Sequence, residues 1–210
     1  MAAVITVAQQ KGGAGKTTLA ANLAVALAAT RRVAVLDIDP QKTLARWHAL
    51  RAARLPPAPA LGFSDASGWR LQPELDRLRR EHDVILVDSA PHLDSDARRA
   101  IRSADLVLVP IQPSAPDIWA AEGTLKVAAE ERRPICLVLN RASGGSRLQA
   151  VLDKELRSRG LTVLPASIGN RTAFSLAFAQ GLGVTELAPR TVAAAELRHL
   201  ADALLALVEP

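Results

Sequence analysis

The segment that most restricts how this chain can fold is QQKGGAGKTT, residues 9–18, which directly follows the apolar run VITVA. Its glycines, Gly12, Gly13 and Gly15, permit backbone angles closed to other residues, so that successive N–H groups can converge on an anion. A helical pattern begins at Lys16, and the N-terminus of a helix favours a phosphate group. The segment therefore predicts a strand, a phosphate-binding loop and a helix in succession.

This loop departs from the common phosphate-loop pattern G-x-x-x-x-G-K-[ST], because Gln10 stands where that pattern has its first glycine. The variant K-G-G-x-G-K-T-T carries two lysines, Lys11 and Lys16. We expect Lys16 to contact the β- and γ-phosphates of a nucleotide and the Thr17 hydroxyl to hold Mg²⁺. A glycine-rich turn without function is the alternative, and the agreement of strand, loop and helix argues against it.

Apolar runs alternate with helical patterns along the chain, and the runs are continuously apolar, as in a parallel sheet covered on both faces. We expect a doubly wound α/β fold with a mostly parallel sheet, as one domain over residues 1–210. Strands are expected at 4–8, 32–39, 83–90, 105–111, 134–140 and 161–168, with a short edge strand around 61–63. Helices are expected at 16–29, 42–53, 71–81, 94–103, 117–131, 146–159, 172–180 and 191–208.

Acidic residues stand at the ends of two expected strands. Asp37 and Asp39 close the second strand, and Asp88 follows four apolar residues in VILVDSAP. Since strands of this fold deliver ligands at their carboxyl ends, we expect Asp88 and Asp37 to support Mg²⁺. Asp39 is a candidate for orienting or activating an attacking water. The alternative is that each acid caps the following loop or helix, which suits a single acid better than acids on two strands beside a phosphate loop.

Composition limits the setting of the protein. No apolar run reaches the roughly 18 residues that cross a bilayer, and no signal-peptide pattern precedes the first strand. Cys136 is the single cysteine and lies in the strand-like PICLVLN, so we expect a cytoplasmic protein in which this thiol is a buried apolar group. The net charge of +5 favours a polyanionic partner, either nucleic acid or an anionic membrane.

Taken together, KGGAGKTT (11–18), DIDPQ (37–41) and VDSAP (87–91) resemble the motifs of the ParA/MinD family of deviant-Walker P-loop ATPases. The chain is most similar to small, ParF-like ParA proteins of plasmid partition and cargo positioning. That similarity is carried by DPQKTLARWHALR, by VLVPIQPSAPDIWAA (107–121) and by SIGNRTAFSLAFAQGLGVTE (167–186). No helix-turn-helix segment precedes the loop, so site-specific operator binding is not expected.

The resemblance implies a cycle that depends on ATP and Mg²⁺. ATP binding produces a sandwich homodimer with two nucleotides at its interface, and the dimer binds double-stranded DNA without sequence preference. A ParB-like or other adaptor protein stimulates hydrolysis and releases the dimer from DNA. Such a cycle segregates or positions plasmids, chromosomes or protein clusters in the nucleoid-associated cytoplasm.

The family's nucleotide-binding residues fall on Lys11, Gly12, Gly13, Ala14, Gly15, Lys16, Thr17, Thr18 and Asn140. The resemblance implies that Lys11 reaches the nucleotide of the other subunit. Two ammonium groups from one loop would repel each other at one phosphate, whereas an outward Lys11 can act in trans as an arginine finger does. A solvated lysine is the alternative. Asn140 is expected to contact the adenine edge, and its alternative is an ordinary turn residue.

Three arginines are the candidates for DNA contact. Arg171 lies in the segment that resembles the family's DNA-contacting region and is the first candidate, and Arg147 and Arg190 rank after it. Phosphate contacts need positive charge and reach rather than a sequence code, so a solvated helix face is the alternative for each arginine. Trp119 is compatible with a dimer interface and with the core.

A MinD-like, membrane-associated positioning ATPase is the alternative function. Membrane-binding helices of this kind are basic and carry large apolar residues, whereas the final stretch of AAELRHLADALLALVEP lacks Lys, Arg and aromatic residues. We therefore expect this helix to pack on the core, with no membrane contact. A metallochaperone or reductase subunit of related fold would need cysteines for a metal cluster, which Cys136 does not supply.

Overall fold

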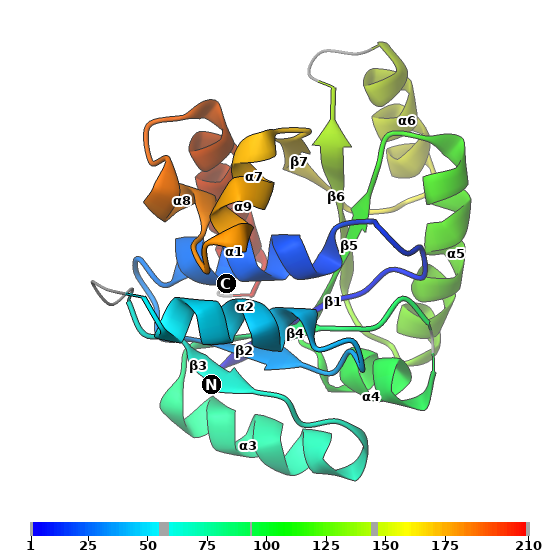
Figure 1. Ribbon diagram of the computed structural model, residues 1–210. Coiled ribbons are helices and arrows are strands. Elements are labelled where there is room, and N and C mark those ends of the chain that lie inside the picture. The colour runs from blue at the N-terminus through cyan, green and yellow to red at the C-terminus, as the bar shows by residue number, and fades with distance from the viewer. Residues whose placement is uncertain (1, 55–58, 93, 144–146, 209–210) are drawn as a thin grey trace.

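The computed structural model describes residues 2–54, 59–92, 94–143 and 147–208, except for the side chains of residues 147–150, 152 and 153. A seven-stranded sheet of order β3-β2-β4-β1-β5-β6-β7 lies between two layers of helices (Figure 1). Every pair of neighbouring strands is parallel, which confirms the expected doubly wound α/β fold. The strands are β1 (Ala3–Val7), β2 (Val33–Asp37), β3 (Gly62–Ser64), β4 (Val84–Asp88), β5 (Leu106–Ile111), β6 (Ile135–Ala142) and β7 (Val163–Gly169).

The helices join successive strands and continue after β7. They are α1 (Lys16–Leu27), α2 (Thr43–Ala52), α3 (Leu71–Glu81), α4 (Ser95–Ser103), α5 (Ala115–Glu130), α6 (Arg147–Ser158), α7 (Thr172–Ala179), α8 (Val184–Leu187) and α9 (Val192–Val208). A 3₁₀ turn, η1 (Gly68–Arg70), leads into α3. One face of the sheet carries α1, α2, α7, α8 and α9, and the other carries α3, α4, α5 and α6 (Figure 1).

Alternate residues of each strand point to opposite faces, and both faces are apolar. In β1, Ile5 and Val7 pack beneath α1 with Val35 of β2, whereas Val4 packs on the other face with Leu36. All five residues of β1 are buried. The continuous apolar runs seen in the sequence follow directly from this two-sided burial.

The strand order reverses at β1, which is the centre of the sheet. Strand β4 lies on one side of β1, with Val7 opposite Asp88, and β5 lies on the other, with Val7 opposite Leu108. Ligands of open α/β sheets bind at such a switch point, outside the carboxyl ends of the strands. The glycine-rich loop leaves β1 at that place.

Several boundaries differ from those predicted. The apolar run at 32–39 is a strand only for Val33–Asp37, because Asp39 already belongs to a turn in which its carbonyl accepts a hydrogen bond from Lys42 N–H. Strand β6 runs on to Ala142 through Arg141, which has φ of 53° at an irregularity in the pairing with β7. Neither η1 nor α8 was predicted.

Helix α9 packs against β7 and α1, as expected for a core helix. Its buried residues include Leu197, Leu200 and Leu204, which belong to the cluster beneath α1. The apolar spacing of the C-terminal stretch is therefore explained by burial within the protein. Among the described residues, the helices all fall short of the length and apolarity that a membrane crossing requires.

Candidate functional site

The loop between β1 and α1 has the backbone that its glycines predict. Gly13 and Gly15 have φ of 77° and 88°, a region that strongly favours glycine. Gly15 is the N-cap of α1, and its carbonyl accepts a hydrogen bond from Leu19 N–H at 2.9 Å. The first turn of α1 therefore presents its free N–H groups at the carboxyl edge of the sheet, where they can bind phosphate oxygens.

Asn140, at the end of β6, is in contact with this loop. Its Nδ2 donates to the carbonyl of Ala14 at 2.8 Å, and its Oδ1 accepts from Arg141 N–H at 3.1 Å. A Cβ atom added at Gly15 would lie 2.7 Å from Nδ2, so a larger residue at position 15 would displace this contact. Asn140 is thus placed beside the site as predicted, and its contact with an adenine edge stays a prediction.

Lys16 and Thr17 begin α1 beneath the loop. Lys16 is buried, and burial lowers the pKa of its amine, while the nearby carboxylates of Asp88 and Asp39 oppose that shift. A buried lysine keeps its proton where negative charge lies beside it, and here the two carboxylates or an anionic ligand supply that charge. Its position suits the expected contact with nucleotide phosphates.

Asp88 ends β4 as a fully buried carboxylate, and neither of its oxygens has a hydrogen-bond partner among the described residues. The Thr17 hydroxyl lies near it without standard hydrogen-bond geometry, and burial raises the pKa of Asp88 to about 8 against the influence of Thr17 and Lys16. Burying a carboxylate without hydrogen-bond partners costs free energy unless a cation or another ligand binds its oxygens. Asp88 and Thr17 are oxygen donors of the kind that Mg²⁺ prefers, so these residues fit that ion.

Asp37 lies beside Asp88 in the sheet but is fully hydrogen-bonded. Its Oδ1 accepts from Asp39 N–H at 3.0 Å, and its Oδ2 accepts from Ala45 N–H at 2.9 Å. Burial raises the pKa of Asp37, and these two backbone hydrogen bonds oppose the shift. The structure thus shows Asp37 fastening the turn that follows β2 to the start of α2, and its support of Mg²⁺ stays a prediction.

Asp39 borders an open hollow beside the loop. Its Oδ1 accepts from Gln41 N–H at 2.9 Å. The hollow has a volume of ≈ 400 Å³, and its lining also includes Gly12, Gly13, Gly15, Lys16, Thr17, Thr18, Thr43, Pro91 and Arg141. Asp39, Lys16 and Thr17 therefore line one space.

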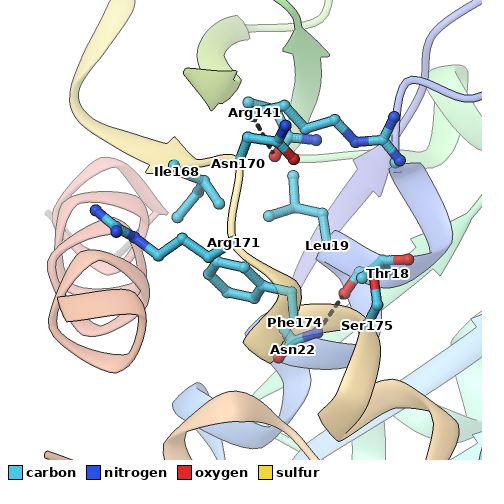
Figure 2. A pocket seen from close by; sticks show the side chains of 12 residues that line it. Thr18, Leu19, Asn22, Arg141, Ile168, Asn170, Arg171, Phe174 and Ser175 are labelled. Atoms are coloured by element: carbon cyan, nitrogen blue, oxygen red, sulfur yellow. Dashed lines mark hydrogen bonds between the residues drawn. The ribbon is translucent and has the colours of Figure 1, made fainter. Parts of the chain in front are cut away.

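A second hollow of ≈ 120 Å³ lies between α1, β7 and α7 (Figure 2). It shares Gly15, Thr18 and Arg141 with the first hollow. The rest of its lining comes from α1, β6, β7, α7 and the turn between β7 and α7: Leu19, Asn22, Asn140, Ile168, Gly169, Asn170, Arg171, Phe174 and Ser175. Two adjoining hollows therefore lie at the carboxyl edge of the sheet, one at the glycine-rich loop and one with a mixed apolar and polar wall.

Lys11 is turned toward its own chain. Its Nζ lies 2.6 Å from Oδ2 of Asp117 in the first turn of α5. The Asp117 side chain is 2% exposed and that of Lys11 is 38% exposed. Lys11 is therefore neither a freely solvated lysine nor aimed outward in this structure, and its action on a second subunit stays a prediction.

The three arginines proposed for DNA contact do not share one face. Arg171 is the N-cap of α7, and Arg190 lies just before α9. Helix α6, which begins with Arg147, packs on the opposite face through Leu156. Arg171 extends toward α9, where its guanidinium lies 2.6 Å from Glu196 (Figure 2). Arg190 is exposed and, within the described part of the chain, forms no ion pair, while the Arg147 side chain lies outside the described residues.

Sequence reasoning missed some residues of the site. Arg141 borders both hollows, and Phe174 and Asn170 line the second. Arg141 directly follows Asn140 at the end of a strand, which was a signal that could have identified it. Asp117 is the partner of Lys11, and the neighbouring Ser114 is the N-cap of α5.

Comparison with known proteins agrees with this site. The family model described as the CobQ/CobB/MinD/ParA nucleotide binding domain matches residues 5–184, which contain the end of β1, the glycine-rich loop and the acids Asp37, Asp39 and Asp88. The maintenance of carboxysome distribution protein A of Gloeobacter kilaueensis is 33% identical over 211 residues, covering 96% of this chain and 93% of that protein. The chromosome-partitioning ATPase Soj of Thermus thermophilus is 29% identical over 243 residues, covering 98% and 96%.

Solved structures of low sequence identity share the fold. A plasmid partition protein of Borrelia burgdorferi bound to AMPPNP superposes with a TM-score of 0.80 at 18% identity, covering 98% of this chain and 99% of that chain. The cell division ATPase MinD of Pyrococcus furiosus superposes with a TM-score of 0.79 at 23% identity, covering 99% and 100%. With the family match over residues 5–184, the chain belongs to the ParA/MinD family of P-loop ATPases.

Proposed function

We propose that this protein is a partitioning ATPase, acting as a single domain, which hydrolyses ATP with Mg²⁺ and positions a cargo through an ATP-dependent homodimer. One observation carries the proposal. Lys16, Thr17, Asp39 and Asp88 converge at the carboxyl edge of the sheet around one glycine-rich loop, and the Asp88 oxygens have no hydrogen-bond partner among the described residues. Buried carboxylates beside a buried lysine are costly to fold and are typical of a site that a charged ligand completes.

Each residue has a separate role in this proposal, set by its position. The loop N–H groups and Lys16 bind phosphate oxygens, Thr17 and Asp88 hold Mg²⁺, and Asp39 orients the attacking water. Mg²⁺, when bound, neutralises charge on the phosphates. Asn140 and the wall of the second hollow bind the nucleoside, with Phe174 supplying an apolar surface.

Lys11 acts in trans in this proposal. Its place on the arm that enters the loop, five residues before Lys16, keeps it away from the phosphate site of its own subunit. A cation supplied by a second subunit stabilises transition-state charge as an arginine finger does, which makes hydrolysis depend on dimerisation.

The proposed partners are double-stranded DNA and a stimulating adaptor protein of the ParB-like kind. Excess positive charge supports non-specific DNA binding, which depends on phosphate contacts. The first two curated relatives, from Halothiobacillus neapolitanus and Gloeobacter kilaueensis, are named for maintaining carboxysome distribution. The proposed cargo in the nucleoid-associated cytoplasm is therefore a plasmid, a chromosome or a protein compartment.

The test combines nucleotide, oligomeric state and DNA. The purified protein is mixed with ATP and Mg²⁺, and its mass is followed by light scattering, with plasmid retention measured at moderate salt. We expect a dimer and retained DNA with ATP, and a monomer with ADP. Absence of any ATP-dependent dimer or DNA retention would contradict the proposal.

Variants assign the roles of the two lysines. Lys16→Ala removes a buried charged contact worth about 1.5–3 kcal/mol, so ATP binding should weaken by roughly 10-fold to 150-fold. Lys11→Ala should retain ATP binding but lose the dimer or stimulated hydrolysis. Lys126→Ala, an exposed lysine on α5, is the matched control and should behave as the unaltered protein.

A further inference from the structure

We propose that Asp117 is a positioning residue that holds Lys11 on its own subunit in the resting protein, so that dimerisation requires this contact to break. The inference rests on the proposed ATP-dependent dimer. It adds a second position for Lys11, docked on α5, and a residue that sets the balance between the docked and in-trans positions.

The contact joins two segments far apart in the sequence. Lys11 lies between β1 and α1, in the segment that enters the glycine-rich loop. Asp117 lies in the first turn of α5, which follows β5. The distance from Nζ to Oδ2 is 2.6 Å, and the Ser114 hydroxyl donates to the same Oδ2. Within the described part of the chain, Oδ1 of Asp117 is buried without a hydrogen-bond partner.

Helix capping does not account for this acid. Ser114 already caps α5, because its Oγ accepts from Asp117 N–H at 3.3 Å. The Asp117 side chain is 2% exposed, so its charge is removed from water. A buried carboxylate is strongly destabilising without a cation, and among the described residues Lys11 is the cation that forms an ion pair with it.

The two positions of Lys11 compete. An ammonium group at 2.6 Å from a buried carboxylate has its charge compensated, which weakens its attraction for a phosphate on another subunit. Moving Lys11 across the interface leaves Asp117 buried without its cation, and that cost opposes dimerisation. A ligand shifts such an equilibrium only by its differential affinity for the two states, so ATP has to overcome the contact.

The first experiment tests the ion pair without nucleotide. Thermal unfolding is measured for Lys11→Met, Asp117→Asn and the double variant. Lys11→Met should lower the melting temperature most, because it strands the buried carboxylate, and adding Asp117→Asn should restore part of that loss. Additive effects of the two substitutions would show that no ion pair holds Lys11, and the inference would be wrong.

The second experiment measures the ATP concentration that gives half of the maximal dimer. Asp117→Asn should lower that concentration by about tenfold, since the docked state no longer retains the cation. Affinity for a fluorescent ADP analogue should not change, because ADP binding does not use Lys11 in trans, whereas a general disturbance of the loop would alter both. Glu122→Gln, an exposed acid on the same helix, is the matched control.

The outcomes separate this inference from the proposed function. If the unaltered protein dimerises with ATP and Asp117→Asn needs as much ATP or more, the inference fails and the proposed function stands. If Asp117→Asn dimerises and the unaltered protein does not, the contact is a stronger restraint than proposed and the inference is supported. If neither dimerises, both are overturned.

Discussion

Asp37 and Asp88 are register partners on the neighbouring parallel strands β2 and β4, yet their carboxylates have opposite surroundings. Both side chains are fully buried. Asp37 accepts two backbone hydrogen bonds, whereas Asp88 accepts none of standard geometry among the described residues. The same residue type at the same level of the sheet is therefore hydrogen-bonded to the backbone at one strand and, among the described residues, has no such partner at the next.

This contrast predicts opposite effects of the same substitution. In EDTA, Asp88→Asn should raise the free energy of unfolding by about 1–3 kcal/mol, because it removes a buried carboxylate whose oxygens accept no hydrogen bond of standard geometry from the described residues. Asp37→Asn should lower it by about 1–3 kcal/mol, because an amide group then faces a backbone N–H. Urea denaturation checks both values, and Asp88→Asn should also lose Mg²⁺-dependent ATP hydrolysis. Equal signs for the two variants would contradict this account of the site.

An ion pair between Arg51 and Glu186 fixes α2 to α8. The Arg51 side chain, 3% exposed, donates to both carboxylate oxygens of Glu186 and to the carbonyls of Pro59 and Gly181. Arg51→Ala removes the guanidinium from these acceptors and leaves the Glu186 carboxylate without its cation, so we expect the free energy of unfolding to fall by about 3–5 kcal/mol. Arg46→Ala, an exposed arginine on the same helix, should change it by less than about 0.5 kcal/mol. Chemical denaturation of the two variants decides between a structural and a solvated role.

Cys136 is predicted to be unreactive in the folded protein. It is buried in β6, and burial raises the pKa of its thiol to about 12. The thiolate is the reactive form, so at pH 8 the native protein should not be labelled by a disulfide reagent, while unfolding in guanidinium should release one reactive thiol. Fast labelling of the native protein would show that β6 opens readily.

The proposed DNA-binding surface can be tested by substituting Arg171 and Arg190 on the face that carries α7 and α9. Arg190→Ala should weaken plasmid binding. It should also reduce the slope of the logarithm of the binding constant against the logarithm of salt concentration by about one. Arg171→Ala should have less effect, because Glu196 already compensates its charge, and Glu196→Gln should strengthen binding by freeing Arg171. Arg80→Ala, on α3 of the opposite face, is the matched control. Equal effects of all three arginine variants would indicate that net charge alone governs binding.

Local signals were sufficient for much of the site. The glycines, Lys16 and the acids at strand ends could be identified because loop geometry and strand ends depend on neighbours in the sequence. The expected strands and helices are present with small shifts at their ends, where tertiary contacts decide. Helix α8 escaped prediction since its four residues are held by distant groups, including the Asn22 side chain, which accepts from Val184 N–H at 2.8 Å.

The sequence by itself determined a parallel α/β sheet with a phosphate loop after its first strand, because apolar runs, glycines and helix patterns are local properties of the chain. Tertiary structure alone decided that Lys11 docks on Asp117, 106 residues away, and that Asn140 contacts Ala14. It also decided that Arg171 pairs with Glu196. Each of these pairs forms across elements brought together by packing, and the charge of a residue does not indicate which distant partner the fold will place beside it.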